Sequence, residues 1–121
     1  MRYMLLCYDD DNAWEKAGPV ALAAARQEAV GLTHEMHAKG QYVLAAPLHP
    51  VSTATSVRVR DGKRLVTDGP FAETREVLGG FFLIEVDNLD QAIELAAKHP
   101  GARVGGVEIR PIVEMEGLPK P

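Results

Sequence analysis

The sequence predicts one α+β domain with an antiparallel sheet, and three observations support this. The chain has 121 residues, which is enough for a single hydrophobic core. Two segments repeat apolar residues every three or four positions, as amphipathic helices do, and several short runs are rich in β-branched and aromatic residues. The composition, 46% apolar and 25% charged, is that of an ordinary globular protein and disfavours disorder or a membrane span.

The N-terminal segment predicts a β-strand. Residues 3–8 are apolar at odd and even positions, which is typical of a strand covered on both faces, and residues 9–12 favour a turn. This apolar run is too short for a signal peptide, and acidic residues follow it where a cleavage site would lie, so we expect a cytoplasmic protein. Cys7 is the single cysteine, which excludes an internal disulfide and predicts a buried thiol within the strand.

A long helix is expected over residues 18–39. Pro19 suits its first turn, and Gly40 suits the position after its last turn. We expect Trp14 in the loop before this helix, where it anchors that loop or a partner surface. One apolar stripe along the helix consists of Leu22, Ala25, Ala29, Leu32 and Met36.

The middle of the chain predicts a short strand over residues 42–46 and then a hairpin. Residues 54–60 alternate in polarity, Asp61-Gly62 is a two-residue hairpin signal, and residues 63–67 form the return strand. The one basic cluster of the sequence lies here, and a solvated hairpin explains it: Arg58, Arg60, Lys63 and Arg64. Because the chain carries a net charge of −4, we expect no nucleic acid as a partner.

The last third predicts strand, helix, strand and tail. After a loop over residues 68–78, Gly79-Gly80 favours a bulge or a close backbone approach, and residues 81–86 form a strand. Asn88 is expected to cap a second helix, with Gln91 in a capping-box arrangement. The expected buried stripe of that helix is Leu89, Ala92, Ile93 and Ala96, and the helix ends at Pro100-Gly101. The final strand is expected over residues 104–112.

This order, βαββ(β)αβ, is the ferredoxin-like plan with an extra strand from the hairpin. Two helices on one face of an antiparallel sheet leave the other face bare, so we expect the chain to associate with itself as a homodimer. The domain is expected over residues 1–112, with residues 113–121 as a C-terminal tail or arm.

A long motif adds a family resemblance. Residues 66–84, with Asp68-Gly69-Pro70-Phe71 near their start, closely resemble the signature of YCII-related proteins of the DGPF-motif branch, and residues 2–6, 54–62 and 107–111 agree in the same order. The resemblance covers the chain up to Pro111 and implies a dimeric α/β barrel, in which two sheets face each other around a lumen. DGPF-type members are often encoded beside extracytoplasmic-function sigma factors. The resemblance therefore also implies an alternative role, that of a non-catalytic regulatory or accessory protein.

The resemblance does not supply an active site. In smaller YCII-type relatives an enzymatic role is inferred from a His–Asp pair, and the matching positions here are Ala29 and His99. Without an imidazole beside a carboxylate, no group at this place is expected to have the pKa near neutral pH that a general base needs.

Candidate site residues are expected at the mouth and wall of the barrel. Loops on a rigid scaffold often carry function, an isolated histidine can act as acid or base, and a guanidinium can hold an acidic ligand in a bidentate fork. Each of these residues also has a purely structural interpretation, as a turn residue, a loop histidine, a surface or dimer-interface arginine, or a core aromatic. The candidates are Asp68, His49 and Glu73 for catalysis, and Arg110, Arg75, Phe71, Phe82 and Tyr8 for substrate binding.

No cofactor or metal is expected. His34 and His37 lie three residues apart on the long helix, but no third or fourth ligand has a suitable spacing. The sequence also lacks a phosphate-binding loop, a dinucleotide fingerprint and a nucleophile elbow.

Two hypotheses about function therefore stay open. The first is an enzyme or binder of a small-molecule ligand at the barrel lumen. The second is a non-catalytic regulatory protein, which predicts an exposed apolar patch near Trp14 or residues 115–121.

Overall fold

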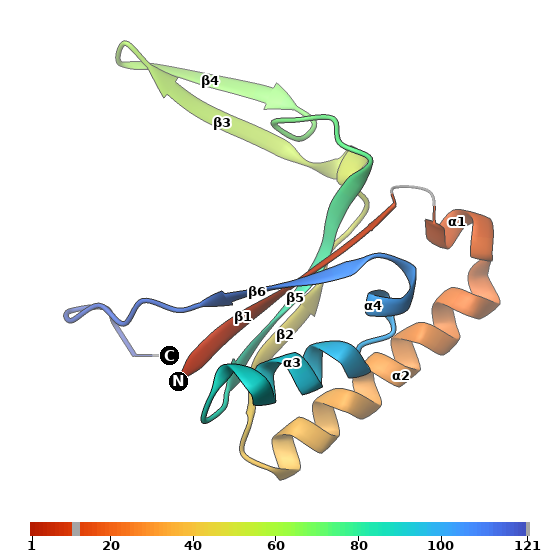
Figure 1. The fold of residues 1–121 in the computed structure, drawn as a ribbon. Helices are drawn as coiled ribbons and strands as arrows, with labels where there is room; N and C mark the ends of the chain where they lie inside the picture. The colour runs from red at the N-terminus through yellow and green to blue at the C-terminus, as the bar shows by residue number, and fades with distance from the viewer. Residues whose placement is uncertain (11–12, 121) are drawn as a thin grey trace.

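The computed structural model describes residues 1–10 and 13–120. Its elements, shown in Figure 1, are β1 (Arg2–Asp10), α1 (Ala13–Ala17), α2 (Pro19–Ala38), β2 (Tyr42–Pro47), η1 (Val51–Thr53), β3 (Thr55–Arg60), β4 (Lys63–Asp68), β5 (Glu76–Glu85), α3 (Leu89–Lys98), α4 (Gly101–Val104) and β6 (Gly106–Pro111). The predicted turn after the first strand falls partly on residues 11–12, which lie outside this description.

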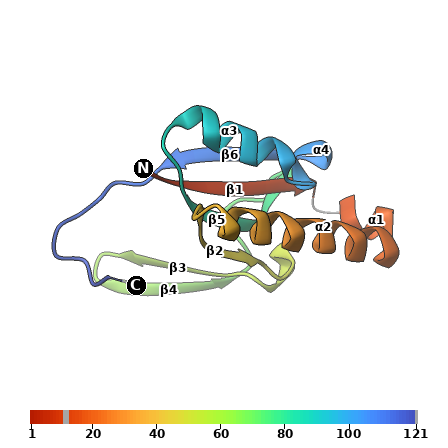
Figure 2. The same cartoon turned by 90° about the horizontal axis from the view of Figure 1, so that it is seen from below.

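The main sheet has four antiparallel strands in the order β2-β5-β1-β6. The long helices α2 and α3 both lie on one of its faces (Figures 1 and 2). This arrangement is consistent with the predicted ferredoxin-like α+β fold. Within the described residues the sheet stays open, with β2 and β6 at its edges, and does not close into a barrel.

The hairpin strands do not join this sheet, so the expected extra strand is wrong. β3 and β4 pair with each other as a separate two-stranded sheet. Figure 1 shows the hairpin standing away from the main sheet, on the side opposite α2 and α3. Its turn is as predicted, because Asp61 and Gly62 both have positive φ, 52° and 74°.

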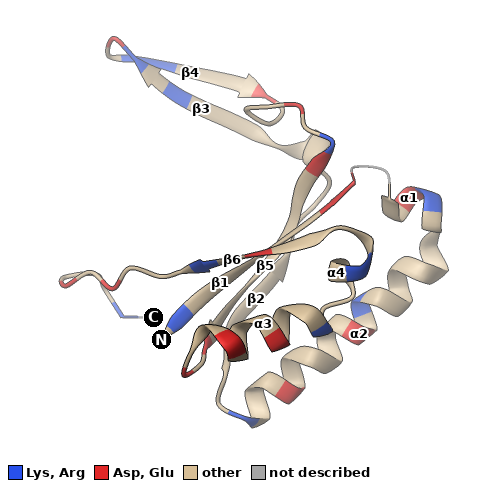
Figure 3. Cartoon of the chain, in the orientation of Figure 1, with Lys and Arg blue, Asp and Glu red and all other residues tan. Residues whose placement is uncertain are grey.

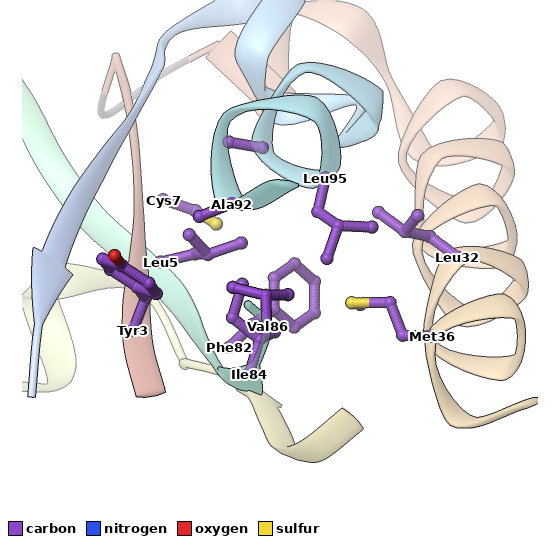
Figure 4. Close-up of a cluster of buried hydrophobic side chains, with 11 residues drawn as sticks. Tyr3, Leu5, Cys7, Leu32, Met36, Phe82, Ile84, Val86, Ala92 and Leu95 are labelled. Carbon is purple, nitrogen blue, oxygen red and sulfur yellow. The ribbon is translucent and has the colours of Figure 1, made fainter. Parts of the chain in front are cut away.

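The hydrophobic core lies between the main sheet and the helices. Odd-numbered residues of β1 point into it while even-numbered ones do not. The strand is therefore covered on one face by its own chain and not on both. Figure 4 shows the side chains that meet there, which include Tyr3, Leu5, Cys7, Leu32, Met36, Phe82, Ile84, Val86, Ala92, Leu95 and Ala96.

Strand β5 begins at Glu76, five residues before the predicted start at residue 81. The ladder with β1 continues past a register shift, from Cys7↔Gly80 to Tyr8↔Leu78, which leaves Gly79 outside the pairing. A Cβ on Gly80 would lie 3.0 Å from the carbonyl oxygen of Ala46 in β2. The glycine pair thus permits both the bulge and the close approach that the sequence predicts.

The helix predictions need two corrections. Trp14 lies in the short helix α1 and not in a loop, and its Nε1 donates a hydrogen bond of 2.7 Å to Oδ2 of Asp9. In α3 the buried residues are Ala92, Leu95 and Ala96, whereas Leu89 and Ile93 are about half exposed. None of the helices in the described residues has both the length and the hydropathy needed to cross a bilayer.

The capping predictions for α3 are confirmed. The Asn88 side chain accepts a hydrogen bond of 2.9 Å from the Gln91 backbone N–H. The Gln91 side chain in turn accepts one of 2.9 Å from the Asp87 backbone N–H, one residue before the expected partner.

Candidate functional site

One face of the main sheet, here called the open face, carries apolar side chains that none of the described helices covers (Figure 2). Antiparallel partners share a face, and the register places Leu6 beside Phe81 and Met4 beside Leu83. None of these four side chains is fully buried, in contrast to their neighbours Leu5 and Ile84 on the helix side. The same face continues onto β2 through Leu44 and Ala46, and onto the C-terminal end of β1 through Tyr8.

Two charged residues border this face on the edge strand β6. Glu108 is the register partner of Leu6, and Arg110 is the register partner of Met4. Nη1 of Arg110 lies 3.5 Å from Oε2 of Glu108, and both side chains are more than half exposed. Such an exposed pair is weak, so the Arg110 guanidinium remains available to an acidic ligand.

The Asp-Gly-Pro-Phe segment closes the base of the hairpin. Asp68 is the last residue of β4 and pairs with Thr55. Gly69 takes a φ of 102°, its N–H donates to the Ala54 carbonyl at 2.7 Å, and its own carbonyl accepts from the Ser56 hydroxyl at 2.6 Å. The motif therefore has a structural role here, whatever chemistry it serves.

Phe71 does not fill an apolar site in this chain. It is 62% exposed, and the guanidinium carbon of Arg58 lies 4.2 Å from its ring centroid. Arg75 follows in the same loop, and its Nε lies 3.6 Å from Oδ2 of Asp10 at the end of β1. Arg75 therefore ties this loop to the C-terminal end of β1.

The structure places the predicted catalytic residues on exposed segments. His49 lies in the corner after β2, Asp68 at the end of β4, and Glu73 in the loop before β5. No hydrogen bond or ion pair joins any two of them within residues 1–10 and 13–120. Their catalytic role stays a prediction.

The predicted substrate-binding residues divide between two faces. Tyr8 and Arg110 lie on the open face, whereas Phe82 is only 7% exposed and packs in the core on the helix side. The phenylalanine on the open face is Phe81, which the sequence reasoning missed. The alternation Phe81-Phe82 carries the signal, because successive strand residues point to opposite faces.

A second group that the sequence missed lies beneath the helices, around His99. Its Nδ1 accepts a hydrogen bond of 2.9 Å from the Gly101 N–H, and its Nε2 lies 4.0 Å from Sγ of Cys7. The ring packs edge-on against Phe82, with ring centroids 5.1 Å apart. Burial, with a smaller contribution from Asp9, raises the pKa of the Cys7 thiol to about 11.

This pair is not an activated nucleophile. Burial lowers the pKa of His99, which favours the neutral imidazole, and the raised pKa of Cys7 keeps its thiol protonated. A reactive Cys–His pair has the opposite arrangement, a thiolate beside an imidazolium. We therefore interpret the pair as part of the core.

His99 predicts a pH dependence of stability. The unfolded chain takes up this proton near the ordinary pKa of 6.5, and the folded chain only at lower pH. The unfolded state therefore binds more protons below pH 6.5, so stability falls as the pH falls through that window. The melting temperature of the wild type should drop more between pH 7 and pH 5 than that of His99→Gln, which keeps an acceptor for Gly101. An equal drop would contradict this, and His34→Gln, at an exposed position, serves as the control.

Two shallow depressions on the described surface include none of the predicted site residues. The first, of about 220 Å³, is lined by Met1, Lys39, Gly40, Gln41, Glu85, Val86, Asp87 and Gln91. The second, of about 440 Å³, lies between α2 and α3–α4 and is lined by Glu28, Leu32, Glu35, Lys98 and Arg103. Among the described residues, no group of three or more His, Cys, Asp or Glu side chains is placed to hold a metal ion.

Comparison with known proteins agrees with the predicted family. Residues 1–116 match the YCII-related domain. The chain is also similar to an uncharacterized protein of Rhizobium meliloti (strain 1021), with 35% identity over 121 aligned residues that cover 93% of this chain and 92% of the relative.

Proposed function

The chain belongs to the YCII-related family, and we propose that it works as a homodimer whose open sheet faces enclose a site for a small organic acid. The observation that carries the proposal is the uncovered apolar face formed by Met4, Leu6, Phe81 and Leu83. We assign the chain to the DGPF-motif branch on the segment Asp68-Gly69-Pro70-Phe71.

Burial of apolar surface favours this dimer. Each side chain removed from water contributes about 25 cal/mol per Å² of apolar area, and a two-fold contact buries every such residue twice. A second copy of the same face is the simplest cover, because an apolar sheet face is complementary in polarity to itself. The polar border of Glu108 and Arg110 then lies at the rim, where charges stay partly hydrated.

The ligand class follows from the groups that meet on this face. Arg110 offers a bidentate fork to a carboxylate, and Leu6, Phe81 and Tyr8 offer an apolar wall to the rest of the molecule. The carboxylate on this face, that of Glu108, is paired with Arg110 and more than half exposed, so the face supports binding directly. Catalysis would require His49, Asp68 or Glu73 to come from the loops beside it.

One observation favours the alternative, a regulatory protein with a protein partner. Met115 and Leu118 in the C-terminal tail are both exposed, which is where that hypothesis places an apolar patch. A link to an extracytoplasmic-function sigma factor rests on the family resemblance.

A thermal-shift screen with small organic acids tests the binding proposal. A ligand present at 100 times its Kd stabilises the native state by about 2.7 kcal/mol, which raises the melting temperature. Arg110→Ala should abolish the shift, and Arg26→Ala, an exposed arginine on α2, should retain it. No shift with any acid, or an equal shift in Arg110→Ala, would contradict the proposal.

A further inference from the structure

The hairpin and the tail have opposite charges. The hairpin, residues 55–68, holds the exposed residues Arg58, Arg60, Lys63 and Arg64, against two aspartates. The tail segment 113–118 holds Glu114 and Glu116 and no cation. Figure 3 shows the basic residues on β3 and β4 and the acidic ones in the tail beyond β6. Opposite fields of this kind favour association between the two segments.

The two faces of the hairpin also carry different kinds of side chain. The register pairs Val57 with Val66, and Val59 lies on the same face. Arg58, Arg60 and Lys63 lie on the other face, because successive strand residues point to opposite sides. All three valines are at least half exposed. Arg64, the register partner of Val59, shares the valine face, and Leu65, the partner of Arg58, shares the other face. One face therefore holds the three valines, and the other holds three of the four cations.

The tail has the matching pattern. Val113-Glu114-Met115-Glu116 alternates apolar and acidic residues, as a strand between an apolar and a basic face would. Val113 and Met115 are exposed, and so is Leu118 further on. Placed along an edge of the hairpin, this segment directs its glutamates to the basic face and Val113 and Met115 to the valines. The two-stranded hairpin has unpaired backbone edges that can accept such a strand.

Within one chain the hairpin and the tail leave the main sheet at opposite ends, and the hairpin then runs back along the sheet at a distance from it (Figures 1 and 2). β5 begins opposite Asp10, and β6 ends opposite Tyr3. Seven steps of about 3.3 Å along β1 separate these positions by about 23 Å. A second copy can bring the two segments together.

Charge selects between the two ways to stack the open faces. A two-fold axis along the strands puts hairpin against hairpin, which brings two sets of four cations together. An axis across the strands puts the hairpin of one copy against the tail of the other, and the charges then have opposite sign. We propose that in the dimer the tail of each copy docks through residues 113–116 as an added strand along the β3–β4 hairpin of the other copy. This rests on the open-face dimer proposed above.

Charge reversal tests the contact between hairpin and tail. We measure the dimer dissociation constant by sedimentation velocity in 50 mM and 500 mM NaCl. Glu114→Lys with Glu116→Lys should weaken the dimer about tenfold at low salt, as a few exposed ion pairs do, and less at high salt. Arg60→Glu with Lys63→Glu should have the same effect, and Arg58 is kept because it stacks on Phe71. All four changes together should restore the affinity to within about threefold of the wild type.

The control is Glu35→Lys with Glu94→Lys, which changes the net charge equally on exposed helix positions and should leave the dimer unchanged. The docking would be overturned if neither double charge reversal changed the dissociation constant, or if the fourfold variant formed a weaker dimer than either double variant. As long as the wild type is a dimer, these outcomes leave the open-face proposal standing. A monomeric wild type would overturn both. Circular dichroism of each variant confirms that the fold is retained.

Discussion

Replacing Leu6 with lysine is expected to convert the dimer into a monomer. Leu6 lies at the centre of the open face, between Phe81 on β5 and Glu108 on β6. In the dimer each copy would bury an ammonium against Phe81 and its apolar neighbours, and the half-exposed Glu108 offsets only part of a cost of several kcal/mol per group. The dissociation constant should rise at least about a thousandfold, equivalent to roughly 4 kcal/mol. Light scattering coupled to size-exclusion chromatography measures the change.

The matched control for this variant is Val30→Lys. Val30 is an exposed apolar residue on α2, the helix layer that covers the other face of the sheet. The Val30→Lys variant also replaces an aliphatic side chain with lysine, but away from the proposed interface, so the molar mass of the dimer should stay unaltered. If Leu6→Lys remained a dimer, the open face would not be the interface.

Gly105→Ala is expected to have the largest effect on stability. A Cβ at this position would overlap the Tyr8 carbonyl oxygen and lie 2.8 Å from Cα of Asp9, and both are backbone atoms that cannot rotate away. The start of β6 or the end of β1 must therefore move. We expect a loss of about 3 kcal/mol in the free energy of unfolding, at the upper end for overpacking a close contact.

The adjacent glycine provides the control. A Cβ on Gly106 would meet no atom within 4 Å, so Gly106→Ala should change stability by less than about 1 kcal/mol. Urea unfolding of the two variants at the same protein concentration makes the comparison. Similar losses in both would show that Gly105 is not a point of close backbone contact.

Much of the fold could be predicted from local patterns. The long helix was predictable from the apolar stripe between Leu22 and Met36 and from Gly40 after the last turn. The structure has this helix over Pro19–Ala38. The Asp61-Gly62 turn and the Asn88 cap were predictable because each depends on only a few neighbouring residues. Where strands pair with distant partners the local signal fails: β5 starts at Glu76 because β1 extends beyond the bulge. The position of the hairpin outside the sheet likewise has no local signal, since its alternation suits either placement.

The candidate site was less predictable for a related reason. Which of Phe81 and Phe82 faces the helices depends on the register with β1, and the sequence alone leaves that register open. The approach of His99 to Cys7 joins residues 92 positions apart and follows from packing alone. Arg110 was predictable as a candidate because it alternates with Val107 and Ile109 along the strand, and its register with Met4 then places it on the open face.

The molar mass of the wild-type chain in solution tests the central proposal most directly. One chain has a mass of 13.1 kDa. Light scattering at micromolar concentration should give about twice that value, because a specific apolar interface of this kind persists at such concentrations. A mass that remained at 13.1 kDa up to the highest soluble concentration would contradict the homodimer and the enclosed site that depends on it.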